Sequence, residues 1–241
     1  MTGKSPIVSI ITISKDDPEG LAKTLASVSG QSFQAYEQIL VLAGRSRDIN
    51  VPADGRIHWT ESESPGISNA LNAGVAAATG EWIQFLNGGD AFSDDRSLEL
   101  LTGARDASVA MICSYARVVQ HGYNLPTRSL QPGRDEFIYI SHQATLFRRD
   151  LFERYGLFSP DIKIRMDLEW LTRLPRETAF RFLETVTVDF DGSGVSSTHI
   201  CTGTLEEARI LAASQYGVAR ALRVLAKLPF RLFKSRIRAI G

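Results

Sequence analysis

The sequence predicts an α/β fold in which a Rossmann-like, mainly parallel central sheet is flanked by helices. Three observations lead to this prediction. Short β-branched runs alternate with helical patterns in the first half of the chain, and glycines close many of the connections between them. The length of 241 residues and the hydrophobic content of 44% suit one large domain that buries its own core. The composition excludes a disordered or fibrous chain.

The first buried strand is predicted at residues 7–13, where a β-branched run follows Pro6. Asp17 and Pro18 are typical of an N-cap and a first helical residue, and Gly30 can end the helix that they begin. Further strands are expected at residues 38–42, 57–60 and 81–86, and a helix of small residues at 67–79, closed by Gly80.

Past about residue 105 the alternation loosens, but no linker separates a second body. We expect a strand at 109–119 with Gly122 in a hairpin turn, short helices at 150–155 and 167–174, a strand at 185–190, and one long amphipathic helix at 205–226. The second half should therefore complete the same sheet. We divide the chain into a main domain at 1–204 and a C-terminal amphipathic helix with a basic tail at 205–241.

The charges are unevenly distributed, although 27 basic residues balance 27 acidic ones. Residues 216–241 hold seven basic residues and no acidic one, which leaves 20 basic against 27 acidic residues in 1–215. Cations interleaved with Phe230 and Leu232 favour the surface of an anionic membrane. A helix that packs on the body and shows a solvated basic face is the alternative. The acidic body argues against nucleic acid as a partner.

Two cysteines supply neither a disulfide framework nor a zinc cluster, so a reducing compartment is the simpler expectation. No run approaches the ~20 apolar residues that span a bilayer. The run at 7–13 is too short for a targeting segment and lacks a cleavage site. We expect a cytoplasmic protein.

Ligands of an open α/β sheet bind at the carboxyl ends of its strands, so the residues that follow each strand are the candidates for chemistry. Neither G-x-G-x-x-G after the first strand nor a P-loop motif is present, which argues against both kinds of nucleotide site. The string Asn87-Gly88-Gly89-Asp90 is the most informative. Its glycines permit close approach of a ligand, and a lone carboxylate with phosphate oxygens is typical of a Mg²⁺ site. A tight turn is the structural alternative.

Several motifs recur in a fixed order between Pro6 and about Ser197. They are the opening strand up to Thr12, residues 20–33, residues 66–82, the string at 87–90, the string His142-Gln143-Ala144-Thr145-Leu146-Phe147, and residues 163–170. In order and spacing they resemble the family 2 glycosyltransferases of the GT-A fold, the type found in bacterial polysaccharide assembly. Asn87 to Asp90 stand where that family carries its D-x-D-type metal motif.

The resemblance implies an inverting transfer of a sugar from a nucleotide-diphosphate donor to an acceptor hydroxyl. Asp90 would bind Mg²⁺ or Mn²⁺ against the diphosphate, and Asp167 would be the general base for the acceptor. Donor-binding roles are implied for Thr12, Ser14, Gly44, Ser46, Gly66, Asn69, Asn87 and Gly88. Acceptor or phosphate contacts are implied for His142, Gln143, Glu169 and Trp170.

Acceptors of this family are often lipid-linked saccharides on the cytoplasmic leaflet, which fits a basic tail and a peripheral position on the inner face of the plasma membrane. Structural alternatives stay open for three of the implied residues. Asp167 could cap a helix, His142 could be a satisfied structural histidine, and Trp170 could pack beside Leu171.

One departure from the family pattern concerns the donor site. The carboxylate that usually follows the second strand is replaced here by Ala43. Glu61 and Glu63 could compensate, and Arg45 and Arg47 could contact phosphate or be solvated. The missing carboxylate motivates a second hypothesis, a non-catalytic GT-A-fold binding or scaffold protein of a polysaccharide assembly complex.

Overall fold

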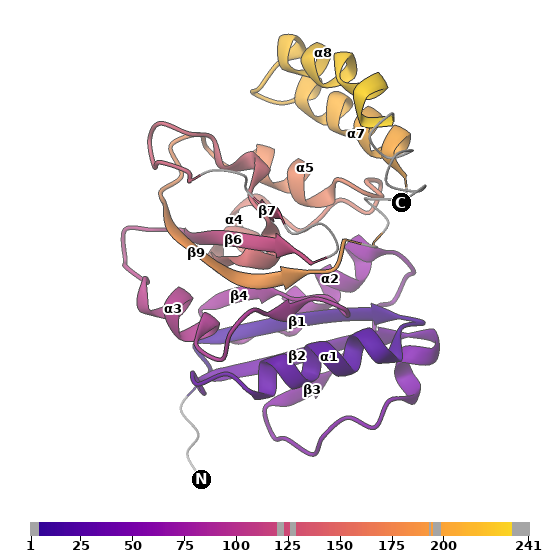
Figure 1. The fold of residues 1–241 in the computed structure, drawn as a ribbon, viewed down its shortest axis with the longest axis vertical. Coiled ribbons are helices and arrows are strands. Elements are labelled where there is room, and N and C mark those ends of the chain that lie inside the picture. Colours follow the sequence, from indigo (N-terminus) through magenta and orange to yellow (C-terminus); the bar gives the residue numbers. More distant parts are fainter. Residues whose placement is uncertain (1–4, 120–122, 126–128, 193, 195–198, 233–241) are drawn as a thin grey trace.

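The computed structural model describes residues 5–119, 123–125, 129–192, 194 and 199–232 of the chain. Figure 1 shows a twisted sheet with helices packed against it and a pair of helices at one end of the molecule. The strands are β1 (Val8–Lys15), β2 (Tyr36–Ala43), β3 (Ile57–Trp59), β4 (Trp82–Phe85), β5 (Ala91–Phe92), β6 (Met111–Val118), β7 (Tyr123–Leu125), β8 (Thr145–Arg148) and β9 (Phe180–Phe190). The α-helices are α1 (Pro18–Ser29), α2 (Ile67–Ala77), α3 (Ser97–Gly103), α4 (Asp150–Tyr155), α5 (Met166–Arg173), α7 (Ile200–Ala213) and α8 (Val218–Ala226). Three short 3₁₀ turns are η1 (Gly44–Asp48), η2 (Phe137–Tyr139) and η3 (His142–Ala144).

All nine strands belong to one sheet, in the order β3-β2-β1-β4-β8-β6-β9-β5, with β7 paired to β6. The block β3-β2-β1-β4 is parallel, and β6 and β9 form a second parallel pair. β8 joins the two parts by antiparallel pairing with β4 and β6. The predicted α/β class is confirmed, and the second half of the chain does complete the first half's sheet. The hairpin turn predicted at Gly122 lies outside the described residues.

The parallel block has the alternating side-chain pattern of a sheet covered on both faces. Ile11 and Ile39 point to the face covered by α2, where they share a buried cluster with Leu71. Leu40 points to the opposite face and packs against Leu21 of α1. The predicted start of α1 is confirmed in detail, since Asp17 caps it by accepting from the Gly20 N–H at 2.9 Å.

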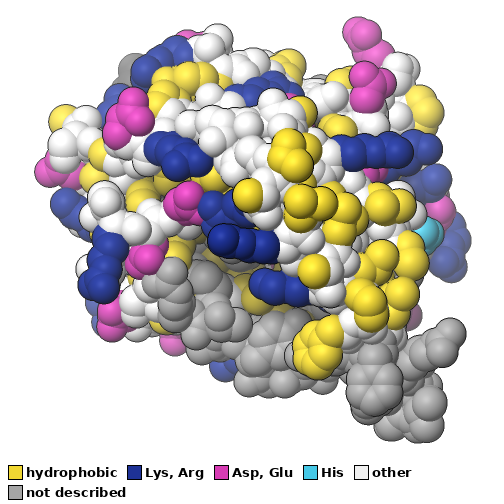
Figure 2. All heavy atoms as spheres, turned by 90° about the horizontal axis from the view of Figure 1, so that it is seen from above, with side chains coloured by type: hydrophobic (Ala, Val, Ile, Leu, Met, Phe, Trp, Pro, Cys, Tyr) yellow, Lys and Arg dark blue, Asp and Glu magenta, His cyan; other side chains and the backbone are white. Residues whose placement is uncertain are grey.

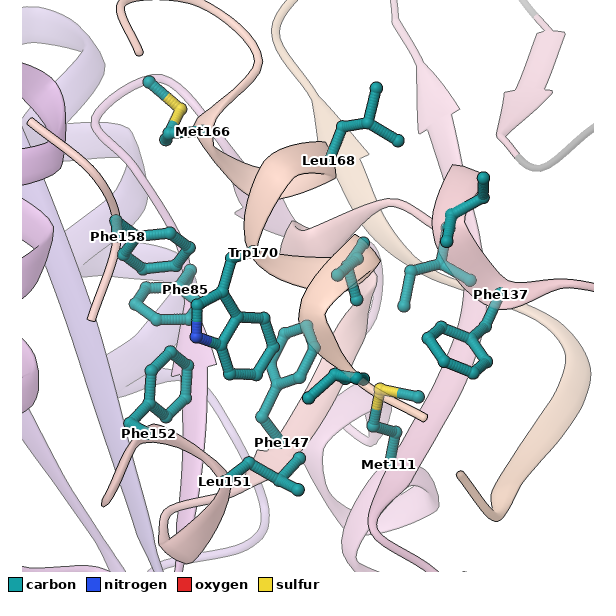
Figure 3. Close-up of a cluster of buried hydrophobic side chains, with 14 of the residues drawn as sticks. Phe85, Met111, Phe137, Phe147, Leu151, Phe152, Phe158, Met166, Leu168 and Trp170 are labelled. Atoms are coloured by element: carbon teal, nitrogen blue, oxygen red, sulfur yellow. The ribbon is translucent and has the colours of Figure 1, made fainter. Parts of the chain in front are cut away.

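The second half of the sheet is anchored by an aromatic cluster made of Phe85, Phe147, Phe152, Phe158 and Trp170 (Figure 3). The Trp170 ring stacks on Phe152 with centroids 4.4 Å apart, and it meets Phe147 edge-on at 5.6 Å. Phe85 meets Phe158 edge-on at 5.4 Å. These contacts connect β4, β8, α4 and α5, so the end of β4 and the start of α5 share one rigid support.

The prediction of a single long helix at 205–226 is wrong. The chain forms two helices here, α7 and α8, and α7 begins at Ile200. The break follows from Gly217, which has a φ of 76° and therefore cannot continue a right-handed helix, and from the extended backbone of Ser214. The two helices pack side by side as a hairpin (Figure 1), with Leu211, Ala221 and Val224 in the main core.

The string at 142–147 is divided between a turn and a strand. His142, Gln143 and Ala144 form the 3₁₀ turn η3, and β8 starts at Thr145. The Thr145 hydroxyl donates to the Ser141 carbonyl at 2.8 Å, which closes this turn. His142 therefore lies at the entrance of a strand rather than within one.

Candidate active site

The candidate site lies where the parallel strands β1, β2 and β4 end. Their pairing registers bring these carboxyl ends to one edge of the sheet, where Ser14, Gly44 and Asn87 follow or close the strands. This is the edge at which open α/β sheets bind ligands. These three residues therefore lie at one edge of the sheet, as their positions after the strands predicted.

The Asn87–Asp90 loop is held tightly against β1 and α1. The Gly88 N–H donates to the Ile13 carbonyl at 2.9 Å, and a Cβ on Gly88 would lie 2.6 Å from Ser14 Oγ. Gly89 has a φ of 95°, a conformation that suits glycine. Both glycines thus serve close approach within the protein itself.

Thr24, on the buried face of α1, is not among the site residues predicted from the sequence. Its hydroxyl donates to the carbonyls of Asp90 at 2.6 Å and Asn87 at 3.1 Å, and it accepts from the Gly89 N–H at 3.1 Å. A hydroxyl residue on the buried face of a helix was the available signal. Thr24 fixes the loop that carries Asp90.

Asp90 is 3% exposed, and its Oδ1 accepts from the Asp191 N–H at 2.9 Å. Burial raises the pKa of its carboxyl to about 7, against the opposing effects of this hydrogen bond and of the nearby His142 charge. Asn87 Oδ1 is buried and has no hydrogen-bond partner among the described residues. A destabilised carboxylate beside an orphaned amide oxygen is a suitable start for a site that takes a hard cation.

No group of three or more His, Cys, Asp or Glu side chains is arranged to hold a metal ion in the described part of the chain. A Mg²⁺ site does not require such a group, because this ion is usually held by one or two carboxylates, with phosphate oxygens and water at its remaining positions. Asp90 and Asn87 fit that pattern.

Two serines join the ends of β1 and β2. Ser14 Oγ and Ser46 Oγ lie 2.9 Å apart, and Ser46 Oγ accepts from the Asp17 N–H at 2.9 Å. Gly44 has a φ of 54°, and a Cβ there would lie 1.9 Å from Asp16 Oδ1. The loops after both strands are thus locked together, and Ser46 is fully buried.

Asp16 follows β1, at a strand end where chemistry was expected, but it is not among the predicted donor-binding residues. It is exposed and held at a φ of 58°, which is uncommon for a residue with a side chain. Its Oδ1 accepts from the Arg45 N–H at 3.0 Å, and its backbone N–H donates to the Ala43 carbonyl at 3.3 Å. A carboxylate from β1 therefore lies beside the position where the family's usual carboxylate is missing.

The two arginines of η1 are engaged with the protein. Arg45 Nη2 donates to the Asp16 carbonyl at 2.9 Å, and Arg47 Nε donates to the Leu42 carbonyl at 2.9 Å. Arg47 also pairs with Glu61 at 3.2 Å. These bonds hold the loops after β1, β2 and β3 to one another.

Gly66 and Asn69 stand at the start of α2. Gly66 has a φ of 122° as N-cap, and Asn69 Nδ2 donates to the Pro65 carbonyl at 2.8 Å. Asn69, Glu61 and Glu63 line an open hollow of about 490 Å³ between α2 and the loop after β3. The expected compensation by the two glutamates stays a prediction.

Thr12 does not reach the site. It is fully buried in β1, and its hydroxyl accepts from Gln38 Nε2 at 3.0 Å. A direct donor contact by this side chain is therefore excluded in this conformation, and Thr12 instead ties β1 to β2.

His142 and Asp167 lie in contact where the turn η3 meets the start of α5. His142 Nδ1 lies 3.1 Å from Asp167 Oδ2, and the Leu168 N–H donates to Asp167 Oδ1 at 2.8 Å. The side chains are 14% and 28% exposed, so both reach the surface of the site. Burial raises the pKa of Asp167, but the hydrogen bond and charge of His142, the charge of Arg165 and the Leu168 N–H outweigh it and lower the pKa. Asp167 is therefore ionised at neutral pH.

The structure contradicts the acceptor contact expected for Trp170. Its ring is 1% exposed inside the aromatic cluster, and its Nε1–H donates to the Gly156 carbonyl at 2.7 Å. No face is free for a sugar, and the packing alternative is confirmed. Trp170 instead anchors the helix that carries Asp167.

Glu169 and Gln143 are also engaged within the protein. Glu169 Oε1 accepts from Arg173 Nε at 2.8 Å, one helical turn away, and Arg173 in turn donates to the Leu157 carbonyl at 2.8 Å. Gln143 is 6% exposed, and its Oε1 accepts from Ser141 Oγ at 2.9 Å. These bonds hold both side chains within the protein, and the acceptor contacts expected of them stay predictions.

Comparison with known proteins places these motifs in a family. Residues 9–167 match the model for glycosyl transferase family 2. An uncharacterized glycosyltransferase of Mycobacterium tuberculosis is 28% identical over 207 residues, which cover 80% of this chain and 78% of the relative. A glycosyltransferase of PGL/p-HBAD biosynthesis from Mycobacterium bovis is 24% identical over 202 residues, covering 79% of this chain and 78% of the relative.

Solved structures share the fold at low sequence identity. A mannosyltransferase from Pyrobaculum calidifontis, in complex with GDP-Man and Mn²⁺, superimposes with a TM-score of 0.69 at 15% identity, covering 97% of this chain and 74% of that chain. Residues 1–349 of S. aureus TarS, in complex with UDP-GlcNAc, give a TM-score of 0.64 at 15% identity, covering 94% and 72% of the two chains. In a second structure of TarS, with a TM-score of 0.67 at 15% identity, the match spans only 43% of that chain.

Proposed function

This chain belongs to glycosyl transferase family 2, and on that premise we propose that it is an inverting glycosyltransferase. It transfers a sugar from a nucleotide-diphosphate donor to a hydroxyl of a lipid-linked saccharide, in the assembly of a cell-surface polysaccharide. The observation that carries the proposal is the partly exposed Asp167 carboxylate, whose Oδ2 lies 3.1 Å from His142 Nδ1. The charge of His142 lowers the pKa of both carboxyl groups, which supports the assignment of Asp90 and Asp167 to one site.

Asp167 acts as the general base. Its carboxylate accepts the proton of the acceptor hydroxyl while the acceptor oxygen bonds to the anomeric carbon. The bond from that carbon to the diphosphate breaks at the same time, and the diphosphate leaves with the electron pair. One displacement without a covalent intermediate inverts the anomeric configuration. The lowered pKa of Asp167 supports this role because the base must be ionised before reaction.

The Asn87–Asp90 loop holds the diphosphate end of the donor. Asp90 and the unpaired Asn87 Oδ1 are the residues that would ligate Mg²⁺ or Mn²⁺. When bound, the metal would offset the negative charge that develops on the departing diphosphate. The nucleoside lies along the ends of β1 and β2, where Gly44 and Asp16 are exposed and the buried pair Ser14–Ser46 supports both loops from within. Asp16 supplies the carboxylate that Ala43 lacks.

Transfer assays test the proposal. The protein is incubated with a panel of UDP and GDP sugars, Mn²⁺ and a lipid extract, and nucleotide release is measured. We expect turnover that Asp167→Asn lowers by about two to four orders of magnitude, the usual range for a general base. Glu169→Gln is the matched control on the same helix, because Glu169 pairs with Arg173 outside the site.

Nucleotide binding measured beside turnover distinguishes the glycosyltransferase from the non-catalytic binding protein. Binding of UDP or GDP with Mn²⁺ raises the melting temperature in either case, by the linkage of binding to folding. A chain that binds nucleotide, yet shows no turnover with any donor and extract, would be the non-catalytic binding protein instead.

The helical hairpin α7–α8 supports association with an anionic membrane. Leu205, Val218 and Leu222 are 48%, 60% and 60% exposed on it. Figure 2 looks onto this end of the molecule and shows hydrophobic groups beside basic ones. The exposed charged residues of the hairpin are basic over the described range 200–227: Arg209, Arg223 and Lys227. An apolar stripe beside cations is typical of a surface that lies on anionic lipid. No helix in the described chain is long and apolar enough to cross a membrane.

Vesicle flotation tests the surface. Wild type should float with vesicles of phosphatidylcholine and phosphatidylglycerol, and should not float with phosphatidylcholine alone. The double variant Val218→Glu/Leu222→Glu should lose binding without unfolding, because both side chains are largely exposed. Leu100→Glu, at a 42% exposed leucine on α3, is the matched control. If the double variant still binds the vesicles, the lipid contact lies in the tail beyond residue 232 and not on the hairpin.

A further inference from the structure

We propose that His142 is a positioning residue for Asp167: the Nδ1–H of His142 donates to Asp167 Oδ2 and holds the carboxylate in the orientation that receives the acceptor proton. The inference rests on the proposed function, in which Asp167 is the base. It replaces the acceptor or phosphate contact that the sequence led us to expect of His142. The juxtaposition of the two side chains, 25 residues apart in sequence, carries it.

The Asp167 carboxylate is held at both of its oxygens. Oδ1 accepts from the Leu168 N–H at 2.8 Å, and Oδ2 lies 3.1 Å from His142 Nδ1. A carboxylate with only the backbone contact could still rotate about its side-chain bonds. The second, side-chain contact selects one rotamer, and each oxygen keeps a lone pair for an incoming hydroxyl. A base fixed in this way loses little freedom when it reacts.

His142 is itself fixed by its neighbours. The turn η3 that carries it is closed by the Thr145 hydroxyl on the Ser141 carbonyl, and Gln84 Nε2 on β4 donates to the Gln143 carbonyl. The imidazole edge also packs against the Phe85 ring, with centroids 6.1 Å apart. The position of the histidine is therefore set by β4 and β8, whereas Asp167 belongs to α5.

The hydrogen bond also fixes the tautomer. Asp167 is an acceptor, so the shared proton is assigned to His142 Nδ1, and Nε2 of the neutral ring carries a lone pair. A phosphate contact would require a donor at Nε2, which only the protonated ring supplies. The charged groups that act on this pair are Asp90 and Arg165, together with Asp191 beside Asp90. Positioning requires only the Nδ1–H, which the neutral and the protonated ring both supply.

Two amide substitutions separate the two nitrogens of the ring. The amide of an asparagine stands near the place of Nδ1, and the amide of a glutamine stands near the place of Nε2. We expect His142→Ala to lower kcat by about tenfold to a hundredfold, the value of a hydrogen bond to a charged group, with the donor KM nearly unchanged. His142→Asn should recover most of kcat and His142→Gln should not.

The opposite pattern overturns the proposal. Recovery by His142→Gln alone, or a raised donor KM or Mn²⁺ requirement with an unchanged kcat, would assign Nε2 to the donor or the metal. His58→Ala, at a half-exposed histidine on β3, is the control and should leave kcat unchanged. Thermal unfolding of every variant shows whether the fold is intact.

A measurement without turnover distinguishes failure of this inference from failure of the proposed function. ¹³C NMR titration of the Asp167 carboxyl should show its pKa rising in His142→Ala and His142→Gln, and staying closer to wild type in His142→Asn. An unchanged pKa in His142→Ala refutes the contact even if the enzyme is active. A shifted pKa in a chain that transfers no sugar keeps the contact and removes the catalytic role of Asp167.

Discussion

The placement of the Asn87–Asp90 loop can be tested by one added methyl group, in Gly88→Ala. The new Cβ would lie 2.6 Å from Ser14 Oγ and 2.8 Å from Ser14 Cβ, whereas ordinary contact begins at 3.4 Å. The loop would have to withdraw from β1 by about 0.6–0.8 Å, which the Gly88 N–H bond to the Ile13 carbonyl opposes. Overpacking of this kind costs about 1–3 kcal/mol. We therefore expect the free energy of unfolding to fall by about 2 kcal/mol.

A double-mutant cycle identifies the atom responsible. Ser14→Ala removes the hydroxyl but keeps the Cβ at 2.8 Å, so it should relieve Gly88→Ala only slightly. Ser14→Gly removes both atoms, so the double variant should be more stable than the sum of the single effects by about 1–2 kcal/mol. Ser14→Gly alone loses the bond to Ser46 and gains backbone freedom, each worth about 1 kcal/mol, which is why the coupling energy is the quantity to read.

Urea denaturation followed by tryptophan fluorescence measures these free energies, with equal m-values as the check that the unfolded state is unchanged. Nucleotide release measured on the same variants shows whether the loop shift reaches the chemistry. If Gly88→Ala unfolds within about 0.5 kcal/mol of wild type, or the two changes are additive, the loop does not rest on Ser14 and the described geometry of the donor edge is refuted.

Three further predictions concern Asp16, Glu37 and Gly217. Asp16→Asn should weaken the binding of UDP or GDP in isothermal titration while leaving the unfolding free energy nearly unchanged, because the exposed side chain keeps an oxygen for the Arg45 N–H and asparagine tolerates a positive φ; unchanged affinity would exclude the contact. Glu37→Leu should lower the unfolding free energy by about 3 kcal/mol, because Glu37 Oε1 accepts from Ser9 Oγ at 2.6 Å and the Thr79 N–H at 2.7 Å. Burial raises the pKa of Glu37, but these hydrogen bonds lower it below 4.5, so its stabilisation is complete above the unfolded pKa and is lost as the pH falls through the folded value. The gap between wild type and Glu37→Leu in urea denaturation should therefore narrow below about pH 4.5, and a constant gap would contradict the assignment. Gly217→Ala should cost about 1 kcal/mol at a φ of 76°, whereas Gly103→Ala, with open space around it, should be neutral in the same thermal unfolding assay.

Local signals determined much of the fold. The capping residues predicted where α1 begins, and the predicted helix at 150–155 coincides with α4, Asp150–Tyr155. The break between α7 and α8 was missed because the apolar period continues across it, and one glycine with a positive φ is enough to end a helix. Periodicity reports which face is apolar, not where the backbone turns.

The sequence predicts where in the sheet the site lies, but it does not predict which side chains of the site bond to each other. Parallel strands that end at one edge made Asn87, Gly88 and Asp90 identifiable from sequence. The contact between His142 and Asp167 joins the turn η3 and α5, and nothing local to either residue encodes it. Trp170 was misassigned for a related reason: α5 lies between the sheet and α7, so most of its side chains are buried and it offers no face to solvent at that position.

The aromatic cluster connects the strand before the Asn87–Asp90 loop with the helix that carries Asp167. Phe85 lies two residues before Asn87 on the strand that leads to the donor loop, and Trp170 lies one helical turn after Asp167 (Figure 3). Both rings pack against Phe158, at 5.4 Å and 5.9 Å between centroids. A shift of either element would therefore disturb close packing whose loss costs about 3–5 kcal/mol for a buried aromatic ring. The separation of the Asn87–Asp90 loop from Asp167 is thus fixed by an apolar core, and His142, which packs on Phe85 and bonds to Asp167, connects the same two elements.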